Sequence, residues 1–289
     1  MSAPVPSGLL IVDKPGGITS HGVVAQARRR LGVRKIGHAG TLDPMATGVM
    51  VLGVGRATRM LGHLALADKT YEATIRLGVS TVTDDAEGDT TDAPGAAGLT
   101  ASSLEEAVAG FVGEISQVPS AVSAIKVDGR RAYAMVRRGE DVELAPRSVT
   151  VSRFDILDVR PATQDGVEVV DVDVVVDCST GTYVRALARD LGASLGTGGH
   201  LTALRRTRVG GFTLEHASDE LVPLDAAARL CFPVVEISDA DFADAVHGRP
   251  VPVRIDAEPT ALLHGDTVVG LYRPDGDLAR PIAVLVEPG

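Results

Sequence analysis

The sequence predicts an α+β fold, because strand-like and helix-like patterns mix along the chain without a regular strand–helix–strand repeat. Every second residue from Val170 to Val176 is valine, which is typical of a half-buried strand. Soon afterwards, apolar side chains keep helical spacing from Val184 to Leu195, and Gly196 ends that helix. A Rossmann arrangement would require a helix after each parallel strand, so it is disfavoured.

The N-terminal part begins with a short apolar strand at residues 9–12, which ends in a turn at residues 14–17. Ser20 is the predicted N-cap of a helix with an apolar stripe, and Gly32 ends it. Beyond the loop that follows, the apolar run at residues 49–54 predicts a buried strand.

The middle of the chain predicts one strand, one long loop and one helix. Residues 71–77 alternate with period two, which places four apolar side chains on one face: Tyr71, Ala73, Ile75 and Leu77. Residues 80–100 are polar and acidic and predict a long loop. Ser103 and Glu106 form a predicted capping box for the helix after it.

Residues 126–147 carry many charges and two glycines, which favours a mobile or RNA-contacting connection before a strand at 149–159. The character of the chain changes near Phe232 and becomes acidic. A short strand, a helix capped by Asp239 and a hairpin turning at residues 274–276 are predicted there. These patterns divide the chain into a large domain (1–231) and a small one (232–289).

The loop at residues 37–48 is the most informative stretch of the sequence. Its glycines and its proline exclude a continued helix or strand, and a loop fixed between two elements is a good mount for a reactive side chain. Asp43 is its one carboxylate and His38 its one imidazole. From spacing alone, the simpler interpretation makes Asp43 a turn residue before Pro44.

The 289 residues carry a net charge of −10, which seems to argue against a nucleic-acid partner, but the charge is uneven. Residues 1–70 carry nine Lys or Arg against three Asp or Glu. Phosphate contacts need local cations rather than a basic protein. Seven cations flank the Asp43 loop: Arg28, Arg29, Arg30, Arg34, Lys35, Arg56 and Arg59. For residues 28–30, the alternative to phosphate binding is that they simply form the solvated face of a helix.

Several classes of protein are disfavoured. No apolar run approaches the length of a membrane-spanning helix, and the N-terminus lacks a secretory signal pattern. Cys178 and Cys231 are the only cysteines, too few for a disulfide framework or a zinc site. The acidic run at residues 83–89 lacks EF-hand spacing and is predicted to be a solvated loop. We therefore expect a cytoplasmic protein with no membrane partner.

Five motifs resemble, in order, those of the TruB family of tRNA pseudouridine synthases, which isomerise uridine 55 in the T loop of tRNA. The stretch GHAGTLDPMATGVMVLGVGRATR from Gly37 resembles the family signature. Residues 10–20, the Lys-Thr-Tyr at 69–71, residues 118–126 and the Gly-Thr-Tyr-Val-Arg at 181–185 resemble four further motifs. Where the family has Pro-Pro, this chain has Pro119-Ser120, which removes no reactive group.

The resemblance implies a pseudouridine synthase fold with a central mixed, largely antiparallel sheet, followed by a small PUA-like β-barrel. It implies a tRNA T stem-loop as partner. Moving the glycosidic bond of uridine from N1 to C5 is neither a redox reaction nor a net hydrolysis, so we expect no cofactor and no metal. We also expect a monomer.

The resemblance also assigns site residues. It makes Asp43 the catalytic aspartate and Arg185 the arginine paired with it, a role that suits a permanently charged, bidentate side chain. It places His38 at the RNA loop, Tyr71 and Tyr183 at the target base, and Leu204 in the pocket wall. Asp85 would join the charge network.

Each assignment has an alternative from the residues alone. Tyr71 would be a core tyrosine, Arg185 a surface arginine, and His38 a structural loop residue. Two other functions also stay open, namely a guide-RNA-dependent synthase of the dyskerin type and a non-catalytic RNA-binding or RNA-folding protein. The bacterial-type Met45-Ala46-Thr47 and the lack of long Lys-rich tails favour the stand-alone enzyme.

Overall fold

The structure is a computed structural model that describes residues 7–120, 126–127, 130–131 and 144–286. Most of the charged stretch at 126–147, predicted to be a mobile or RNA-contacting connection, therefore lies outside the described residues. The chain divides into two compact units, a first unit of Met1–Ala67 with Arg208–Gly289 and a second unit of Asp68–Thr207. This division differs from the one predicted from sequence, and the boundary after residue 231 stays a prediction.

The N-terminal part of the first unit is a small antiparallel sheet. β1 (Gly8–Lys14) pairs with β3 (Thr47–Val54), with Leu10 opposite Leu52. β2 (Ile36–His38) also pairs with β3. Two short helices follow, η1 (Gly55–Arg59) and α2 (Leu61–Ala65). The loop that carries Asp43 thus connects two paired strands. The sequence predicts the strand that follows the loop, whereas β2, the strand before it, was not predicted.

The two faces of the β1–β3 pair are covered by different elements, because their apolar side chains alternate. One face packs against α1 (Ser20–Leu31), and the residues in this cluster include Leu10, Met50, Leu52, Val23, Val24 and Ala27. The other face packs against α6 (Leu224–Cys231), in a cluster that includes Leu9, Ile11, Val49, Val51, Ala227 and Ala228. The sheet is therefore buried on both sides.

The C-terminal part of the first unit holds a four-stranded sheet in the order β14-β15-β16-β17. β14 is parallel to β15, and the other pairs are antiparallel. The elements are β13 (Phe212–Thr213), η2 (Leu214–His216), β14 (Val234–Glu236), α7 (Asp239–Ala245), β15 (Thr260–His264), β16 (Thr267–Asp275) and β17 (Leu278–Val284). The predicted hairpin is confirmed, and the PUA-like assignment stays a prediction.

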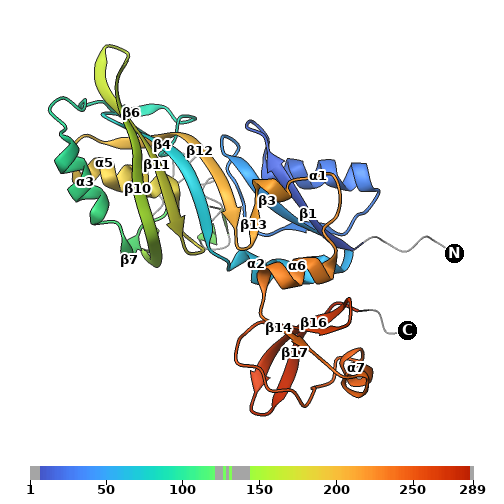
Figure 1. Cartoon of the computed structure of the whole chain (residues 1–289). Helices are drawn as coiled ribbons and strands as arrows, with labels where there is room; N and C mark the ends of the chain where they lie inside the picture. The colour runs from blue at the N-terminus through green and yellow to red at the C-terminus, as the bar shows by residue number, and fades with distance from the viewer. Residues whose placement is uncertain (1–6, 121–125, 128–129, 132–143, 287–289) are drawn as a thin grey trace. The chain divides into compact units, whose positions relative to one another are not determined.

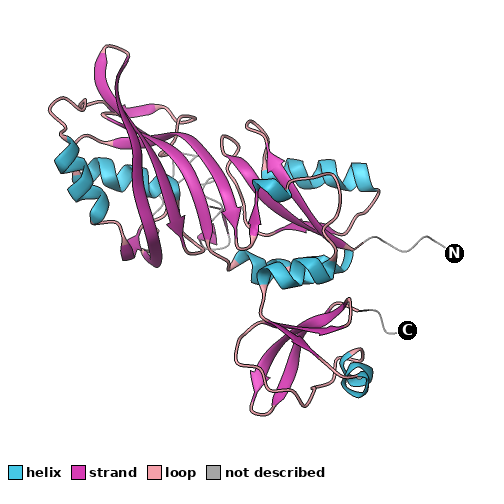
Figure 2. Cartoon of the chain, viewed as in Figure 1, coloured by secondary structure: helices cyan, strands magenta, loops and turns pink. Residues whose placement is uncertain are grey.

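The second unit is built on a sheet in the order β12-β4-β11-β10-β7, drawn in magenta in Figure 2. The strands are β4 (Lys69–Leu77), β7 (Gly113–Gln117), β10 (Arg147–Gln164), β11 (Val167–Cys178) and β12 (Gly199–Val209), whose last two residues belong to the first unit. The pairs β4–β11, β11–β10 and β10–β7 are antiparallel. Each unit combines helices with a largely antiparallel sheet, so the predicted α+β class is confirmed.

Helices and shorter strands complete the second unit. α3 (Ala101–Ala109) and α5 (Val184–Ser194) lie side by side (Figure 1). The predicted apolar face of β4 is confirmed, because every second residue from Lys69 to Leu77 is buried. The predicted long loop at 80–100 instead contains a paired β5 (Ser80–Thr81) and β6 (Thr90–Asp92). A further pair is β8 (Lys126–Val127) with β9 (Arg130–Arg131).

Three predicted helix caps are wrong. The N-caps are Thr19 for α1, Thr100 for α3 and Ser238 for α7, each with a side-chain oxygen that accepts from a first-turn N–H. In each case the chain offers two good capping residues within three positions, and the upstream one adopts the extended backbone that an N-cap requires. Because Thr19 caps α1, the Ser20 hydroxyl can bond to the main chain of Leu42 instead.

Candidate active site

The loop that carries Asp43 spans residues 39–46, between β2 and β3. Gly40 near its start and Gly48, the second residue of β3, have positive φ angles of 101° and 103°, which residues with a Cβ rarely adopt. Asp43 is half-buried, and its carbonyl oxygen accepts a hydrogen bond from the Ala46 N–H at 3.2 Å. The turn before Pro44 that the sequence predicts is therefore present.

Lys14 holds this loop from β1. Its side chain is 0% exposed, and the Nζ atom donates to the carbonyl oxygens of Ala46 at 2.6 Å, Pro15 at 3.0 Å and Pro44 at 3.1 Å. A buried ammonium group has to replace the water that it loses, and main-chain carbonyl oxygens do so here. The positions after Asp43 are consequently tied to the end of β1.

Ser20 holds the same loop from α1. Its hydroxyl donates to the carbonyl oxygen of Leu42 at 2.9 Å and accepts from the Leu42 N–H at 2.8 Å. Ser20 is buried, so both bonds are shielded from water. The residue before Asp43 is therefore fixed to the first turn of a helix, and Asp43 has an anchor on each side.

His38 is the last residue of β2 and is half-buried. Its ring lies edge-on against the ring of His21 from α1, with the centroids 5.8 Å apart. The ring is thus oriented by its neighbours at the start of the Asp43 loop.

Arg185 lies in the first turn of α5, where the chain turns back after β11. Its side chain is 5% exposed, and Nη1 donates to the carbonyl oxygen of Thr83 at 2.7 Å. The same atom lies 3.5 Å from Oδ2 of Asp85, whose side chain is 4% exposed. The interpretation of Arg185 as a surface arginine is therefore wrong.

Asp85 is itself held in place by its own loop. Its Oδ1 atom accepts from the Thr83 hydroxyl at 2.5 Å and from the Glu87 N–H at 3.0 Å. Each oxygen of the Asp85 carboxylate thus has a partner, Oδ1 from its own loop and Oδ2 from Arg185.

The prediction of a solvated acidic loop at residues 83–89 is wrong for two of its members. Asp84 and Asp85 are both buried. Asp84 Oδ2 lies 3.3 Å from Nη1 of Arg189, and burial raises the pKa of the Asp84 carboxyl although Arg189 and Arg185 oppose the shift. Local spacing gave no sign of this, since both arginines come from a helix about a hundred residues later.

The predicted base-contacting residues all lie in the second unit. Tyr71 is buried on β4, opposite Val176 of β11. Leu204 is buried on β12. Tyr183 is half-buried and occupies the N-cap of α5, two positions before Arg185. The burial of Tyr71 is compatible with a core tyrosine as well as with a pocket wall.

A pair of buried cations lies near the start of β4. Burial and the charge of Arg206 lower the pKa of Lys69 to about 8. Burial raises the pKa of the Cys178 thiol, the cross-strand neighbour of Lys69, to about 11. Lys69 therefore belongs to the interior, and it gains or loses its proton in a mildly alkaline range.

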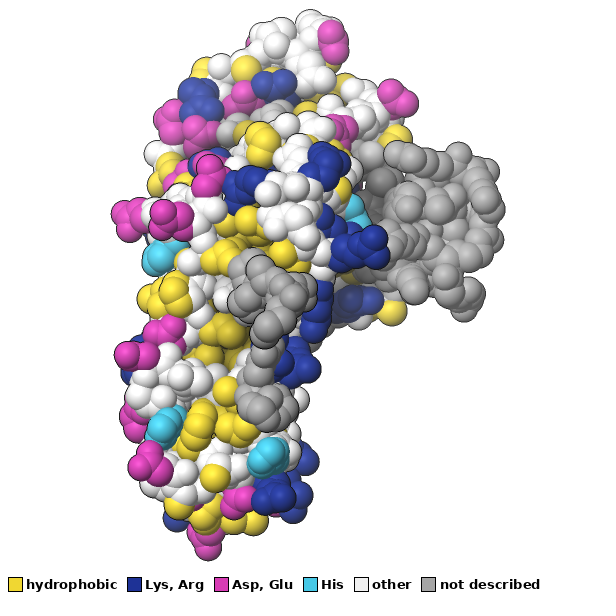
Figure 3. All heavy atoms as spheres, turned by 90° about the vertical axis from the view of Figure 1, so that its right-hand side faces the viewer, with side chains coloured by type: hydrophobic (Ala, Val, Ile, Leu, Met, Phe, Trp, Pro, Cys, Tyr) yellow, Lys and Arg dark blue, Asp and Glu magenta, His cyan; other side chains and the backbone are white. Residues whose placement is uncertain are grey.

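The seven cations around the Asp43 loop divide into two sets. Four have contacts within the first unit. Arg28 donates to the Ile36 carbonyl, Arg30 pairs with Asp219, Arg56 donates to the Val286 carbonyl and Arg59 to the Val284 carbonyl. Arg29, Arg34 and Lys35 form the second set and are exposed, as are Arg28, Arg30 and Arg59 of the first. Figure 3 shows Lys and Arg side chains in dark blue and Asp and Glu side chains in magenta, and both kinds are exposed on the face drawn.

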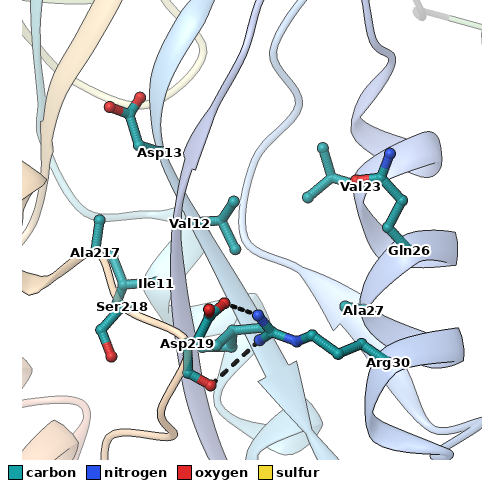
Figure 4. A pocket seen from close by; sticks show the side chains of 11 residues that line it. Ile11, Val12, Asp13, Val23, Gln26, Ala27, Arg30, Ala217, Ser218 and Asp219 are labelled. Atoms are coloured by element: carbon teal, nitrogen blue, oxygen red, sulfur yellow. Dashed lines mark hydrogen bonds and ion pairs between the residues drawn. The ribbon is translucent and has the colours of Figure 1, made fainter.

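A pocket of about 490 Å³ lies in the first unit between β1, α1 and the segment at 217–219. Figure 4 shows Arg30 reaching from α1 to Asp219, where it also donates to the main-chain carbonyl at 3.3 Å. The residues that line this pocket include Asp13 and Gln26 but neither Asp43 nor any other predicted site residue.

Two further properties concern the part of the chain that the structure describes. None of its helices is both long enough and apolar enough to cross a membrane. No group of three or more His, Cys, Asp or Glu side chains in those residues is arranged to hold a metal ion.

The predicted site residues belong to two units. Asp43 and His38 lie in the first, and Tyr71, Asp85, Tyr183, Arg185 and Leu204 lie in the second. Within the second unit, Arg185 and Asp85 come together, as the resemblance implies. The pairing of Arg185 with Asp43 stays a prediction.

Sequence reasoning missed the anchoring contacts of Lys14 and Ser20. Lys14 follows Asp13 at the end of β1 and precedes Pro15, a position where a lysine is ordinarily solvated. Ser20 was assigned to a cap because serine is a strong N-cap former. No local signal distinguishes these roles, since the partners lie 22 to 32 residues away.

Two family models match adjacent parts of the chain. Residues 28–184 match the TruB family pseudouridylate synthase N-terminal domain, and residues 185–230 match the tRNA pseudouridylate synthase B C-terminal domain. Together the two models cover Asp43 and every other predicted site residue.

Curated relatives match nearly the whole chain. A tRNA pseudouridine synthase B of Cutibacterium acnes is 56% identical over 97% of this chain and 98% of its own length. One of Mycobacteroides abscessus is 52% identical over 96% of each. Among solved structures, the chain resembles one from a Cbf5-Nop10-Gar1 complex, with a TM-score of 0.71 and 26% identity over 97% of this chain and 85% of the other. The expected pseudouridine synthase fold is confirmed, and the PUA-like barrel stays a prediction.

Proposed function

Because the chain belongs to the TruB family of pseudouridylate synthases, which are isomerases, we propose that it converts uridine 55 in the T loop of tRNA to pseudouridine, with Asp43 as the catalytic aspartate. The observation that carries the proposal is the placement of Asp43 on a loop anchored on both sides, by Ser20 at Leu42 and by Lys14 at Pro44 and Ala46. Catalysis requires such fixed placement.

The reaction is an isomerisation. The C1′–N1 bond of the uridine breaks, the base turns, and a bond forms between C1′ and C5, after which the proton on C5 leaves and N1 gains one. A carboxylate can serve as nucleophile or as proton acceptor in such a sequence. No electrons leave the substrate and no water is consumed, so the residues of the chain suffice.

Arg185 supports an ionised Asp43 in this proposal. A carboxylate in a closed site tends to pick up a proton, and a guanidinium beside it counters that tendency. The Thr83 carbonyl and the Asp85 carboxylate fix the orientation of the Arg185 side chain, and Asp85 offsets the cost of burying its charge. Asp85 would thus act on the reaction through Arg185.

The target base has to leave the T-loop stack before reaction. Tyr71 and Tyr183 would hold it by stacking, worth about 1–3 kcal/mol per base, and Leu204 would form an apolar wall of the pocket. With only 3% aromatic residues, the chain has few alternatives for this role. His38 would contact the RNA loop beside Asp43.

The exposed cations would bind phosphate groups of the same tRNA. Arg29, Arg34 and Lys35 are exposed. Arg28 and Arg30 are exposed as well but also make contacts within the first unit. The small C-terminal sheet would be the PUA-like domain, although its acidic charge weakens the case for RNA contact there. We propose a cytoplasmic, monomeric enzyme that acts on tRNA without a guide RNA.

The guide-dependent alternative has one observation in its favour. The chain also resembles a structure described as an H/ACA RNP bound to a substrate RNA containing 2′-deoxyuridine, with 25% identity and a TM-score of 0.70 over 96% of this chain. Curated relatives above 50% identity are instead tRNA pseudouridine synthase B proteins. Modification of free tRNA by the purified chain alone would decide for the stand-alone enzyme.

The decisive experiment incubates purified protein with an unmodified tRNA transcript and maps pseudouridine by position. Wild-type protein should modify position 55 alone. Asp43→Asn should form none while it still binds tRNA, because the amide keeps the shape and loses the nucleophilic charge. Asp219→Asn, at an exposed carboxylate, is the matched control and should stay active. Pseudouridine formation by Asp43→Asn would refute the assignment, and tRNA folding without modification by wild type would favour the non-catalytic alternative.

A further inference from the structure

The start of α5 is fastened to the end of β7 by one side chain. Gln117, the last residue of β7, is 2% exposed. Its Oε1 atom accepts from the Tyr183 N–H at 2.8 Å, and its Nε2 atom donates to the Tyr183 carbonyl oxygen at 3.1 Å. A single carboxamide therefore satisfies both main-chain groups of the N-cap residue of α5.

We propose that Gln117 is a positioning residue for the reaction, which sets the main chain of Tyr183 and thereby the directions of the Tyr183 and Arg185 side chains. The inference rests on the proposed function and extends it to a residue 66 positions from the helix that it holds. Gln117 does not contact the substrate. It acts through the first turn of α5.

The need for such a contact follows from the local structure. No side chain caps α5 in the usual way, since the N-cap residue is a tyrosine and its own side chain makes no capping hydrogen bond. The turn before it is tied to β10, because the Ser179 N–H donates to the Thr150 carbonyl at 2.8 Å and the Ser179 hydroxyl accepts from the Thr150 N–H at 2.9 Å. Gln117 supplies the second tie, four residues further on.

Only a carboxamide fits this place. It offers a donor and an acceptor side by side, whereas a carboxylate offers acceptors alone. Glutamate would keep the bond from the Tyr183 N–H but set an anionic oxygen against the Tyr183 carbonyl. Leucine has a similar size and would leave both main-chain groups without this partner, so α5 could begin in a slightly different place. A displacement of about 1 Å in a catalytic group can cost about 100-fold in rate.

The test compares Gln117→Leu and Gln117→Glu with a matched control, Thr197→Val. Thr197 is buried just beyond the C-terminal end of α5, where its hydroxyl donates to the carbonyl oxygen of Gly192 in the helix at 3.4 Å and to that of Gly198 at 3.0 Å. The valine removes a buried hydrogen bond from the same helix without touching Tyr183. For each protein we would measure the melting temperature, the Kd for tRNA, the single-turnover rate of pseudouridine formation and the hydrogen exchange of the Tyr183 and Arg185 amides.

We expect both Gln117 variants to lose about 10- to 100-fold in single-turnover rate, with the Kd changed less than about threefold and faster exchange at Tyr183. Thr197→Val should lose melting temperature to a similar extent and keep its rate. The inference is overturned if Gln117→Leu reacts at the wild-type rate, or if its rate falls no further than that of Thr197→Val. Should wild-type protein modify no tRNA, the proposed function fails instead, and amide exchange at Tyr183 still decides whether Gln117 holds the start of α5.

Discussion

The hydroxyl group of Ser20 and the main chain of Leu42 form two reciprocal hydrogen bonds, so that the first turn of α1 holds the residue immediately before Asp43. Thr19, one position earlier, caps the same helix through its bond from the Gly22 N–H. Two adjacent hydroxyl residues thus serve different purposes, one for the helix and one for the loop.

Ser20→Ala and Thr19→Ala should therefore separate loop placement from helix stability. Ser20→Ala leaves buried main-chain groups of Leu42 without their partner, at a cost of about 1–3 kcal/mol, and lets the Asp43 loop shift. Thr19→Ala should cost about 1 kcal/mol through loss of the cap. Urea denaturation would measure the two losses of stability. Single-turnover assays should show a rate loss of about tenfold or more for Ser20→Ala and none for Thr19→Ala. Equal rates in the two variants would argue against the anchoring role.

Lys14→Met should destabilise the protein and slow the reaction. The change keeps the unbranched apolar part of the side chain and removes the ammonium that binds three carbonyl oxygens, so we expect a loss of about 3 kcal/mol in the free energy of unfolding. Lys35→Met, at an exposed lysine, is the control and should change stability by less than about 0.5 kcal/mol. If Lys14→Met unfolds at the wild-type urea concentration, the three bonds do not stabilise the loop.

The reaction rate should depend on the shape of the side chain at position 185 as well as on its charge. Arg185→Met should lower the single-turnover rate by about 100-fold or more, and Arg185→Lys should recover little, because a point charge cannot reproduce the guanidinium fork. Asp85→Asn should give a smaller loss, since the Thr83 carbonyl still orients Arg185. Arg160→Met, on an exposed part of β10, is the control. Full activity of Arg185→Met would show that the reaction does not need an ion pair between Arg185 and Asp43.

Lys69 should make stability depend on pH in a mildly alkaline range. Its pKa is about 8 in the folded chain and near 10.5 when exposed, so between these values the unfolded chain binds more protons and the folded state gains stability as pH rises. Below pH 8 the buried charge costs about 3 kcal/mol. The stability of Lys69→Met relative to wild type, from urea denaturation, should therefore be greatest below pH 8 and decline toward pH 10.5. If the two proteins differed in free energy of unfolding by the same amount at every pH, the lowered pKa of Lys69 would be contradicted.

The local elements were largely predictable, because their signals lie within a few residues. The alternation on β4 and β11 predicted two strands of the sheet of the second unit, and the apolar stripe of α5 predicted its helix. The strands β7 and β12 of the same sheet were not predicted. The caps were misplaced by one to three residues because neighbouring Ser, Thr and Asp residues compete for the same position. The small β5–β6 pair was missed, since its strands have only two and three residues.

The candidate site was predictable only in its reactive residues. The Asp43 loop and Arg185 stand out as motifs, whereas the residues that hold them have no motif of their own. Lys14 and Ser20 lie in plain strand-end and helix-start positions, and Gln117 ends a strand. The burial of Asp84 and Asp85 also escaped prediction, because a run of acids is ordinarily solvated.

The sequence alone determined the fold class, because this depends on residue type and on short-range spacing. The family and the candidate catalytic groups followed from the resemblance of five short motifs to those of the TruB family. Only the tertiary structure decided that Lys14, Ser20 and Gln117 fasten the site segments and that Asp85 lies against Arg185. The reason is physical: a buried polar group has to find a partner wherever the fold brings one within about 3 Å, and sequence distance does not limit that choice.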